Sequence, residues 1–252
     1  MTITTRAAVV REVNALSIER VLLDNPLPHE VLVRMQAAGV CHSDLGTLQG
    51  HMRAKPPLVL GHEGAGIVAA VGSAVTRVHP CDHVMINWMP HCNVCPQCLR
   101  GRPNLCDRLY ATTFQALMPD GTTRLHTADG MALKHYLSAS TMADYAVLDE
   151  SSVIPIPDDV PFDVAAVIGC AVVTGVGAAL HTGEAKPGMH AAVIGCGGVG
   201  LSAIMGCALA NCQTIIALDT VPAKLEFARE LGATHTVLVT KGMDVPAALR
   251  QI

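Results

Sequence analysis

The chain has 252 residues, of which half are hydrophobic and few are aromatic, and its formal net charge is −4. A chain of this length can form one large domain or two smaller ones, each with a buried core. The mild negative charge, without any basic cluster, argues against nucleic acid or an anionic membrane surface as a partner.

The location of the protein is predicted from its first residues and from its one long uncharged stretch. Residues 1–6 lack the charged-then-apolar pattern of a signal peptide, so we expect a cytoplasmic protein. Residues 190–218 carry no charge and are long enough to span a membrane. Their five glycines, together with Asn211 and Gln213, instead divide the stretch into strand, turn, helix and strand, so we expect no membrane segment there.

The first part of the chain predicts a β-rich, barrel-like domain. Short strands are expected at residues 7–10, 16–21 and 30–37, and the last of these shows partial alternation of apolar and polar side chains. No long helical pattern occurs in this part.

Two short polar clusters follow, each flanked by apolar and glycine residues. The first contains Cys41 and the second contains His62, and thiolate and imidazole are both good zinc ligands. A single cysteine or histidine is commonly a core or surface residue without a ligand. The glycines beside His62 would let the backbone pack closely next to a metal.

The strongest local signal is a loop with four cysteines. Cys92, Cys95, Cys98 and Cys106 are separated by two, two and seven residues, with turn-forming residues between them. Four sulfurs from one loop can surround a zinc ion and leave no position for substrate, which is typical of a structural site. An iron–sulfur cluster is the competing use of four thiolates, but the bacterial ferredoxin spacing differs at the fourth cysteine. Disulfides or unused thiols are further alternatives, disfavoured because no signal peptide is seen.

The middle of the chain gives weaker predictions. Residues 110–145 look irregular, residues 141–148 read as a strand, and the segment after residue 157 predicts a helix that Asp158 or Asp159 could cap. Cys170 lies in apolar surroundings, so its position alone favours a buried core cysteine.

A dinucleotide-binding turn is predicted where a buried strand meets a helix. Gly195, Gly197 and Gly200 have the spacing that permits a tight turn, close approach of a pyrophosphate, and close packing of helix on strand. A second buried strand at residues 214–218 ends on Asp219, in the place of the acceptor for a ribose hydroxyl. An acid there repels a 2′-phosphate and therefore favours NAD over NADP. The alternative is an ordinary glycine turn in an α/β protein.

From residue 190 the pattern is β-α-β-α-β. Strands are expected at residues 191–194, 214–218 and 234–239, and helices at 199–211 and 222–231. Pro222 suits the first position of a helix and Gly232 the position after its end. Residues 244–252 would begin a third helix.

Taken together, these motifs resemble the zinc-containing medium-chain alcohol dehydrogenases over essentially the whole chain. Residues 39–44 resemble the first zinc segment of that family, residues 61–66 resemble its Gly-His-Glu motif, and the spacing of the four cysteines also matches. The implied fold is α/β plus β. A GroES-like β-rich catalytic domain would occupy residues 1–160, and the first half of an NAD-binding Rossmann domain, a doubly wound parallel sheet, residues 161–252.

The resemblance also implies site residues. Cys41, His62 and Cys170 would bind a catalytic zinc, and the four-cysteine loop a structural zinc, giving two zinc ions per chain. Ser43 would take the alcohol proton, Asp44 would orient His62, and Glu63 would assist ligand exchange behind the metal. Contacts to NAD are implied for these residues: His42, Thr174, Gly195, Gly197, Gly198, Val199, Gly200, Asp219 and Lys224.

Two departures from the family pattern stand out. Gly46 occupies a position where several animal members have a proton-relay histidine, although His51 is nearby in sequence. The chain also supplies only three of the six strands of a full Rossmann domain. We therefore expect a truncated chain that is poorly soluble and weakly active, with an unpaired apolar edge on the strand at residues 191–194.

The implied function is oxidation of a small-molecule alcohol to an aldehyde or ketone, with hydride transfer to NAD. One alternative is a thiol-dependent formaldehyde dehydrogenase, because residues 41–44, Asn87-Trp88 and residues 101–103 resemble that branch somewhat. Another is a zinc-binding remnant without catalysis. Full-length relatives are expected to be homo-oligomers.

Overall fold

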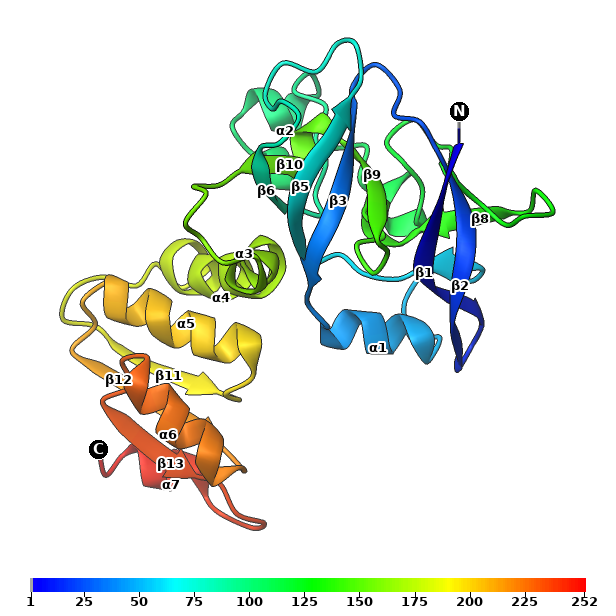
Figure 1. Ribbon diagram of the computed structural model, residues 1–252. Helices are drawn as coiled ribbons and strands as arrows, with labels where there is room; N and C mark the ends of the chain where they lie inside the picture. Colours follow the sequence, from blue (N-terminus) through cyan, green and yellow to red (C-terminus); the bar gives the residue numbers. More distant parts are fainter. Residues whose placement is uncertain (1) are drawn as a thin grey trace. The chain divides into compact units, whose positions relative to one another are not determined.

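The computed structural model describes residues 2–252, which form two compact units (Figure 1). The first ends at Cys170 and the second runs from Ala171 to Ile252. Each unit has its own hydrophobic clusters and is described separately below.

One half of the first unit is a closed β-barrel, as the sequence predicted. Its strands, in barrel order, are β1 (Thr2–Glu12), β2 (Ala15–Asp24), β7 (Leu125–His126), β8 (Ala132–His135) and β4 (Leu58–Val59). β1 and β2 pair in antiparallel register from Thr2 opposite Asp24 to Glu12 opposite Ala15. Val9, Leu23 and Leu133 are fully buried in its core, which explains why apolar residues alternate along these strands.

The other half of the first unit is a five-stranded sheet. Its order is β10 (Val153–Pro155), β6 (His83–Ile86), β5 (Gly64–Val71), β3 (Glu30–Ala38) and β9 (Tyr145–Asp149). The pairings within it are antiparallel. Val33, Val68, Ile86 and Leu148 form a common core. β9 begins later than the expected strand at residues 141–148.

The α-helices of the first unit are α1 (His42–Leu48), the single turn α2 (Pro96–Leu99) and α3 (Phe162–Val167). The sequence pattern predicted a helix only for the last of these. The expected cap of α3 by Asp158 or Asp159 was wrong, because Pro161 is its N-cap and has extended dihedral angles. A proline also biases the residue before it away from helix, which delays the start of α3.

The second unit contains a parallel sheet of three strands. Its order is β11 (His190–Ile194), β12 (Thr214–Asp219) and β13 (His235–Leu238). The helices of this unit are α4 (Val173–Gly177), α5 (Gly198–Leu209), α6 (Pro222–Glu230) and α7 (Val245–Leu249). This confirms the predicted β-α-β-α-β order and the helix after residue 244.

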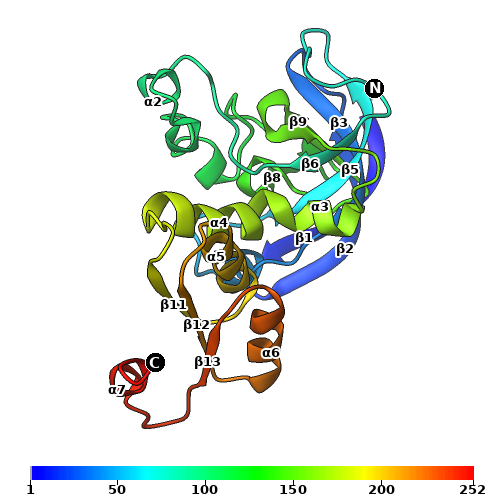
Figure 2. The ribbon, with the colours of Figure 1, turned by 90° about the vertical axis from the view of Figure 1, so that its left-hand side faces the viewer.

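Successive residues of β12 pack on opposite faces of the three-stranded sheet. Ile215 and Ala217 join the cluster formed with α5 and α6, whereas Ile216 and Leu218 contact residues of the α7 region. Figure 2 shows α6 and α7 on opposite sides of β13. A sheet covered on both faces is typical of the Rossmann type and explains the continuous apolar run of β12.

Residues 190–218 form β11, α5 and β12, so they do not form the membrane helix considered for that stretch. Another segment, Phe162–Thr182, contains α3 and α4 and is helical over 21 residues. By length and composition it is long and apolar enough to cross a membrane. One such helix is weak support for a membrane, since core helices of soluble proteins pass the same test.

Candidate functional site

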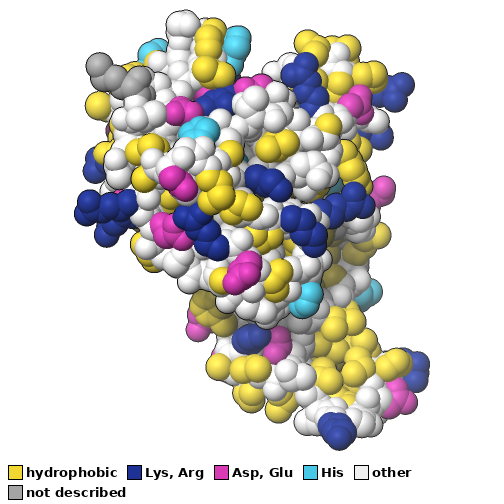
Figure 3. All heavy atoms as spheres, turned by 90° about the vertical axis from the view of Figure 1, so that its right-hand side faces the viewer, with side chains coloured by type: hydrophobic (Ala, Val, Ile, Leu, Met, Phe, Trp, Pro, Cys, Tyr) yellow, Lys and Arg dark blue, Asp and Glu magenta, His cyan; other side chains and the backbone are white. Residues whose placement is uncertain are grey.

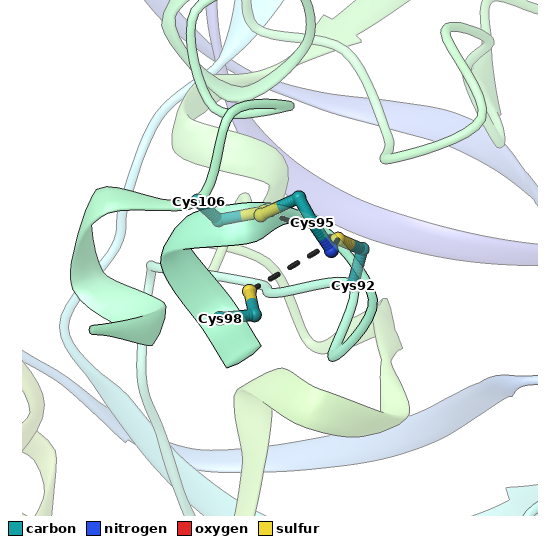
Figure 4. A group of neighbouring side chains, drawn as sticks. All are labelled: Cys92, Cys95, Cys98 and Cys106. Atoms are coloured by element: carbon teal, nitrogen blue, oxygen red, sulfur yellow. Dashed lines mark hydrogen bonds between the residues drawn. The ribbon is translucent and has the colours of Figure 1, made fainter. Parts of the chain in front are cut away.

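The four cysteines of the predicted zinc loop converge on one point (Figure 4). The sulfur atoms of Cys92 and Cys98 are 4.0 Å apart, those of Cys95 and Cys106 are 3.9 Å apart, and those of Cys106 and Cys92 are 3.6 Å apart. Four thiolates around one zinc ion, with bonds of about 2.3 Å, have sulfur atoms about 3.8 Å apart. The cage therefore has the size for a single ion, which favours zinc over a cluster of several irons.

The thiols of this loop differ in pKa because backbone N–H groups and burial act on them unequally. Backbone N–H groups stabilise one of the thiolates. They lower the pKa of Cys92 to about 6, with the N–H of Val94 as the main cause and that of Cys95, 3.3 Å from the sulfur, as a further one. Burial, and then Cys95, raise the pKa of Cys98 to about 12. A divalent cation would stabilise all four thiolates together, so its binding would release protons.

A second group of potential ligands lies elsewhere in the first unit. The ligand atoms of Cys41, His62, Glu63 and Cys170 all lie within 4.8 Å of one another. His62, Glu63 and Cys170 are buried and Cys41 is half-buried. Cys41, the adjacent pair His62 and Glu63, and Cys170 come from three segments that are far apart in sequence, so only the fold brings them together.

Each of these residues is placed by its local structure. Cys41 is the N-cap of α1, and His62 and Glu63 lie between β4 and β5. Cys170 follows Gly169, where a side chain would collide with the carbonyl oxygen of Ile86 at the end of β6. A glycine at position 169 thus lets the helical segment approach the sheet closely enough for Cys170 to reach the other ligands.

Asp44 is buried beside this group and links its parts. Its Oδ2 accepts a hydrogen bond from the N–H of Cys41 at 3.0 Å, and its Oδ1 accepts one from the N–H of Gly61 at 3.1 Å. The same Oδ1 is 3.2 Å from Nδ1 of His62. A carboxylate there favours the tautomer with the proton on Nδ1, which leaves Nε2 of His62 free to bind a metal.

The electrostatics of the group favour a cation. Hydrogen bonds from Cys170 and then His62 lower the pKa of Cys41 to about 3, while the Cys41 thiolate raises the pKa of Cys170. Burial opposes protonation of His62, but Asp44 and Cys41 outweigh it and raise its pKa to about 9. Burial also raises the pKa of Glu63. Two thiol groups, an imidazole and a carboxyl group at such close range are the donor set of a transition-metal site.

A cavity of about 340 Å³ opens next to His62 and Cys170. Ser43 also lines it, and its Oγ is 3.7 Å from Sγ of Cys41. Tyr136 lies in the wall and donates a hydrogen bond from its hydroxyl to the carbonyl oxygen of Ser43 at 3.0 Å. Sequence reasoning missed Tyr136, because no local pattern connects it with residue 43.

The glycine turn of the second unit has the features expected for binding a dinucleotide. Gly195 has a φ of +93°, which favours glycine, and a side chain at Gly200 would collide with the carbonyl oxygen of Gly195. Nothing lies within 4 Å of a Cβ placed on Gly197. Packing within the unit therefore requires Gly200 but leaves the space at Gly197 open, as close approach of a ligand demands.

Asp219 holds this turn in place. Its Oδ2 accepts a hydrogen bond from the N–H of Cys196 at 2.8 Å, and its Oδ1 accepts one from the N–H of Val221 at 2.9 Å. These bonds, that from Cys196 above all, lower the pKa of the carboxyl group. Nζ of Lys224 lies 3.9 Å from Oδ2. The bond from Cys196 could not be seen in the sequence, where the two residues belong to different strand ends.

The other residues implied for the coenzyme fall in both units. His42 is the first residue of α1 in the first unit, and Gly198 and Val199 begin α5 in the second. Thr174 lies in α4, also in the second unit. Gly46 is a buried residue of α1, and His51 lines the cavity beside the metal ligands.

Comparison with known proteins gives two family matches. The profile described as "Alcohol dehydrogenase GroES-like domain" matches residues 27–158, and the profile "Zinc-binding dehydrogenase" matches residues 198–252. Among curated proteins, an alcohol dehydrogenase class-3 of Cereibacter sphaeroides is 44% identical over 238 residues, covering 92% of this chain and 62% of the relative. An S-(hydroxymethyl)glutathione dehydrogenase of Paracoccus denitrificans is 43% identical, covering 92% and 63%.

Solved structures give the same result. An alcohol dehydrogenase zinc-binding domain protein from Burkholderia ambifaria superposes with a TM-score of 0.93 at 38% identity, covering all of this chain and 68% of that one. Benzyl alcohol dehydrogenase from Acinetobacter calcoaceticus superposes with a TM-score of 0.91 at 32% identity, covering 99% and 67%. The chain spans about 62% of the length of the first of these curated relatives.

Proposed function

Because the chain belongs to the family of zinc-binding alcohol dehydrogenases with a GroES-like domain, we propose that it oxidises an alcohol to an aldehyde or ketone with NAD as hydride acceptor. The observation that carries this proposal is the meeting of Cys41, His62 and Cys170 beside one cavity. Two thiolates and an imidazole leave a fourth position open for a substrate oxygen, as in catalytic zinc sites.

In this proposal, Cys41, His62 and Cys170 hold a catalytic zinc, and the four-cysteine loop holds a structural zinc. The catalytic zinc supplies Lewis acidity, which makes a bound alcohol easier to deprotonate. Asp44 holds the imidazole of His62 through Nδ1, so that Nε2 keeps its direction toward the metal. Glu63 has a carboxylate oxygen within 4.8 Å of the three ligand atoms, but it is buried and does not line the cavity, so its proposed role is to assist during exchange of substrate and water.

Ser43 is the proposed acceptor of the alcohol proton. Its hydroxyl lines the cavity next to His62 and Cys170, where a substrate oxygen would lie. Tyr136 fixes the backbone of Ser43 through its carbonyl oxygen. A proton taken there must leave toward solvent, and His51, which is exposed and lines the same cavity, lies on that side.

The second unit would bind the coenzyme. The turn from Gly195 to Gly200 would receive the pyrophosphate at the N-terminus of α5. Asp219 would accept a hydrogen bond from the adenosine ribose, and its negative charge favours NAD over NADP. His42, Thr174 and Lys224 are proposed coenzyme contacts as well. In this proposal, residues 1–160 form the catalytic domain and residues 161–252 form the first half of the coenzyme domain. The proposed location is the cytoplasm.

A second candidate function is oxidation of the adduct of formaldehyde with a low-molecular-weight thiol. Its support is the 43% identity with the Paracoccus denitrificans relative, which is named S-(hydroxymethyl)glutathione dehydrogenase. A strict need for glutathione together with formaldehyde would favour it over a general alcohol dehydrogenase. A zinc-binding remnant without catalysis would bind zinc and reduce no NAD with either substrate.

The first experiment is elemental analysis of zinc in the purified chain and in C170A. We expect two zinc ions per chain, falling to one in C170A, because that change removes a ligand of the catalytic site alone. C81S is the control, since Cys81 is exposed and lies outside both ligand groups. One zinc in both proteins would contradict the catalytic site, and none would contradict both sites. NAD reduction with alcohols, and with formaldehyde plus glutathione, then separates the candidate reactions.

A further inference from the structure

The cavity beside the proposed catalytic zinc has buried residues at its floor and exposed residues at its mouth. His62 and Cys170, at the floor, are buried. Trp88 and Phe114, in the wall, are half-buried, and Tyr110 is 66% exposed. Arg53 lines the cavity and is exposed, so it lies at the mouth. A bound molecule would therefore reach the floor with one end and Arg53 with the other.

The wall is a connected set of aromatic rings. The ring centroids of His62 and Trp88 are 6.4 Å apart, those of Trp88 and Phe114 are 6.2 Å apart, and those of Phe114 and Tyr110 are 5.4 Å apart. Their planes are tilted or edge-on to one another, so each ring supports its neighbour. Such a wall offers contact area to a planar apolar body, and at about 340 Å³ the cavity has room for a single substituted ring.

The mouth carries positive charge that no acid neutralises. The guanidinium carbon of Arg53 is 5.5 Å from the ring centroid of Tyr110, a cation–π contact that holds the side chain against another residue of the cavity lining. Among residues 2–252, no Asp or Glu lines the cavity and none forms an ion pair with Arg53. Nζ of Lys55 binds the carbonyl oxygens of Gly50 and Met52 and adds a second cation to this loop.

From this gradient we propose that the substrates are aromatic primary alcohols with an anionic group at the far end of the ring, and that Arg53 selects that group. The proposal rests on the function given above, because it places the hydroxyl end at the zinc ligands. A guanidinium can bind a carboxylate through two parallel hydrogen bonds, which fixes direction as well as charge. An uncharged aryl alcohol would use the aromatic wall alone.

The test uses Trp88, which is the only tryptophan in the sequence and lies in the cavity wall. Its fluorescence reports binding in this cavity without any need for turnover. The purified zinc-loaded chain is titrated with 4-(hydroxymethyl)benzoate and, in parallel, with benzyl alcohol. We expect the carboxylate ligand to bind about fivefold tighter, which corresponds to about 1 kcal/mol for one partly exposed charge pair.

Three variants sharpen the comparison. R53Q should weaken binding of 4-(hydroxymethyl)benzoate about fivefold and leave benzyl alcohol within about twofold. R53K, which keeps the charge but loses the two-point geometry, should fall between R53Q and the unmodified chain. R20Q is the matched control, because Arg20 is an exposed arginine of β2 that does not line the cavity.

Equal affinities for the two ligands, or equal weakening of both in R53Q, would overturn the proposal. Tight binding of glutathione with formaldehyde, dependent on Arg53 and without any preference for aromatic ligands, would overturn its aromatic part. The proposed dehydrogenase function fails differently, through missing zinc or missing NAD reduction while the binding preference persists. If the chain reduces NAD but binds the charged and the uncharged ligand equally well, the inference about Arg53 is rejected and the proposed dehydrogenase function stands.

Discussion

His135 is a fully buried histidine of β8 whose two ring nitrogens have different surroundings. Its Nε2 accepts a hydrogen bond from the N–H of Arg124 at 3.0 Å. Its Nδ1 is buried and has no partner among residues 2–252. Burial, with a smaller effect from the charge of Arg124, lowers the pKa of His135 to about 3. The folded protein therefore keeps this imidazole neutral at pH values where an unfolded chain protonates it.

We predict that His135 makes the first unit sensitive to acid. The unfolded histidine binds a proton below about pH 6.5, so the stability due to the neutral folded form is complete above that pH. It is lost as the pH falls toward the folded pKa, with a limiting slope of about 1.4 kcal/mol per pH unit. The free energy of unfolding is measured with urea at pH 7.5 and at pH 5.0. Between these pH values the unmodified chain should lose about 2 kcal/mol more than H135Q. A difference between the two proteins that stays constant with pH would contradict this role.

Single residues also show what sequence alone can and cannot predict. Cys41 and His62 lie in recognisable segments, and the structure brings them together. Cys170 looked like a core cysteine from its surroundings, because a buried thiol and a metal ligand share the same apolar neighbours. Its proximity to Cys41 depends on the close packing of Gly169 against Ile86, a contact between distant segments that no local pattern contains.

The glycine turn before α5 allows a paired test at the scale of one element. In G200A the new methyl group would collide with the carbonyl oxygen of Gly195, so we expect a loss of about 1–3 kcal/mol in the free energy of unfolding. In G197A the methyl group enters open space at ordinary dihedral angles, so stability should change by less than about 0.5 kcal/mol. If that space receives the pyrophosphate, G197A should still weaken NADH binding about tenfold or more, measured by fluorescence. Equal stability losses in the two variants would refute the division of roles.

The four-cysteine loop is an element without an apolar core. Its large side chains point outward, with Val94 66%, Leu99 73% and Leu105 51% exposed, and its helical pieces are single turns. Only the metal can then supply most of its folding free energy. We predict that C98S loses one zinc per chain and that trypsin cuts after Arg100 about tenfold faster or more. C81S should behave like the unmodified chain. Unchanged resistance of C98S to trypsin would show that the loop folds without its metal.

Helices whose first and last residues carry clear start and stop signals were predicted well. Pro222 begins α6 and Gly232, with a φ of +112°, follows its end, so residues 222–231 were placed almost correctly. α1 was missed because it is only seven residues long and because its N-cap is a cysteine. In such a short helix, tertiary contacts such as those of Asp44 outweigh intrinsic propensity.

The whole chain combines a first unit with a closed barrel and a second unit with an open sheet edge. Within residues 2–252, β11 pairs only with β12, so its other edge presents free N–H and C=O groups. Ile194 at its end is 79% exposed. Figure 3 shows hydrophobic side chains gathered on one face of the second unit. Exposed apolar strand edges are templates for pairing with another chain.

We predict that this edge makes the chain associate with itself and that I194K reduces the association. A lysine at an exposed strand edge opposes pairing through its charge and hydration, and costs little where the side chain is already in water. Sedimentation velocity over a range of concentrations should show larger species for the unmodified chain and mainly monomer for I194K. The control is L209K, since Leu209 is 70% exposed at the last residue of α5, on a helix and not on a strand edge. If L209K reduces association as strongly as I194K, general surface hydrophobicity and not the open edge drives it.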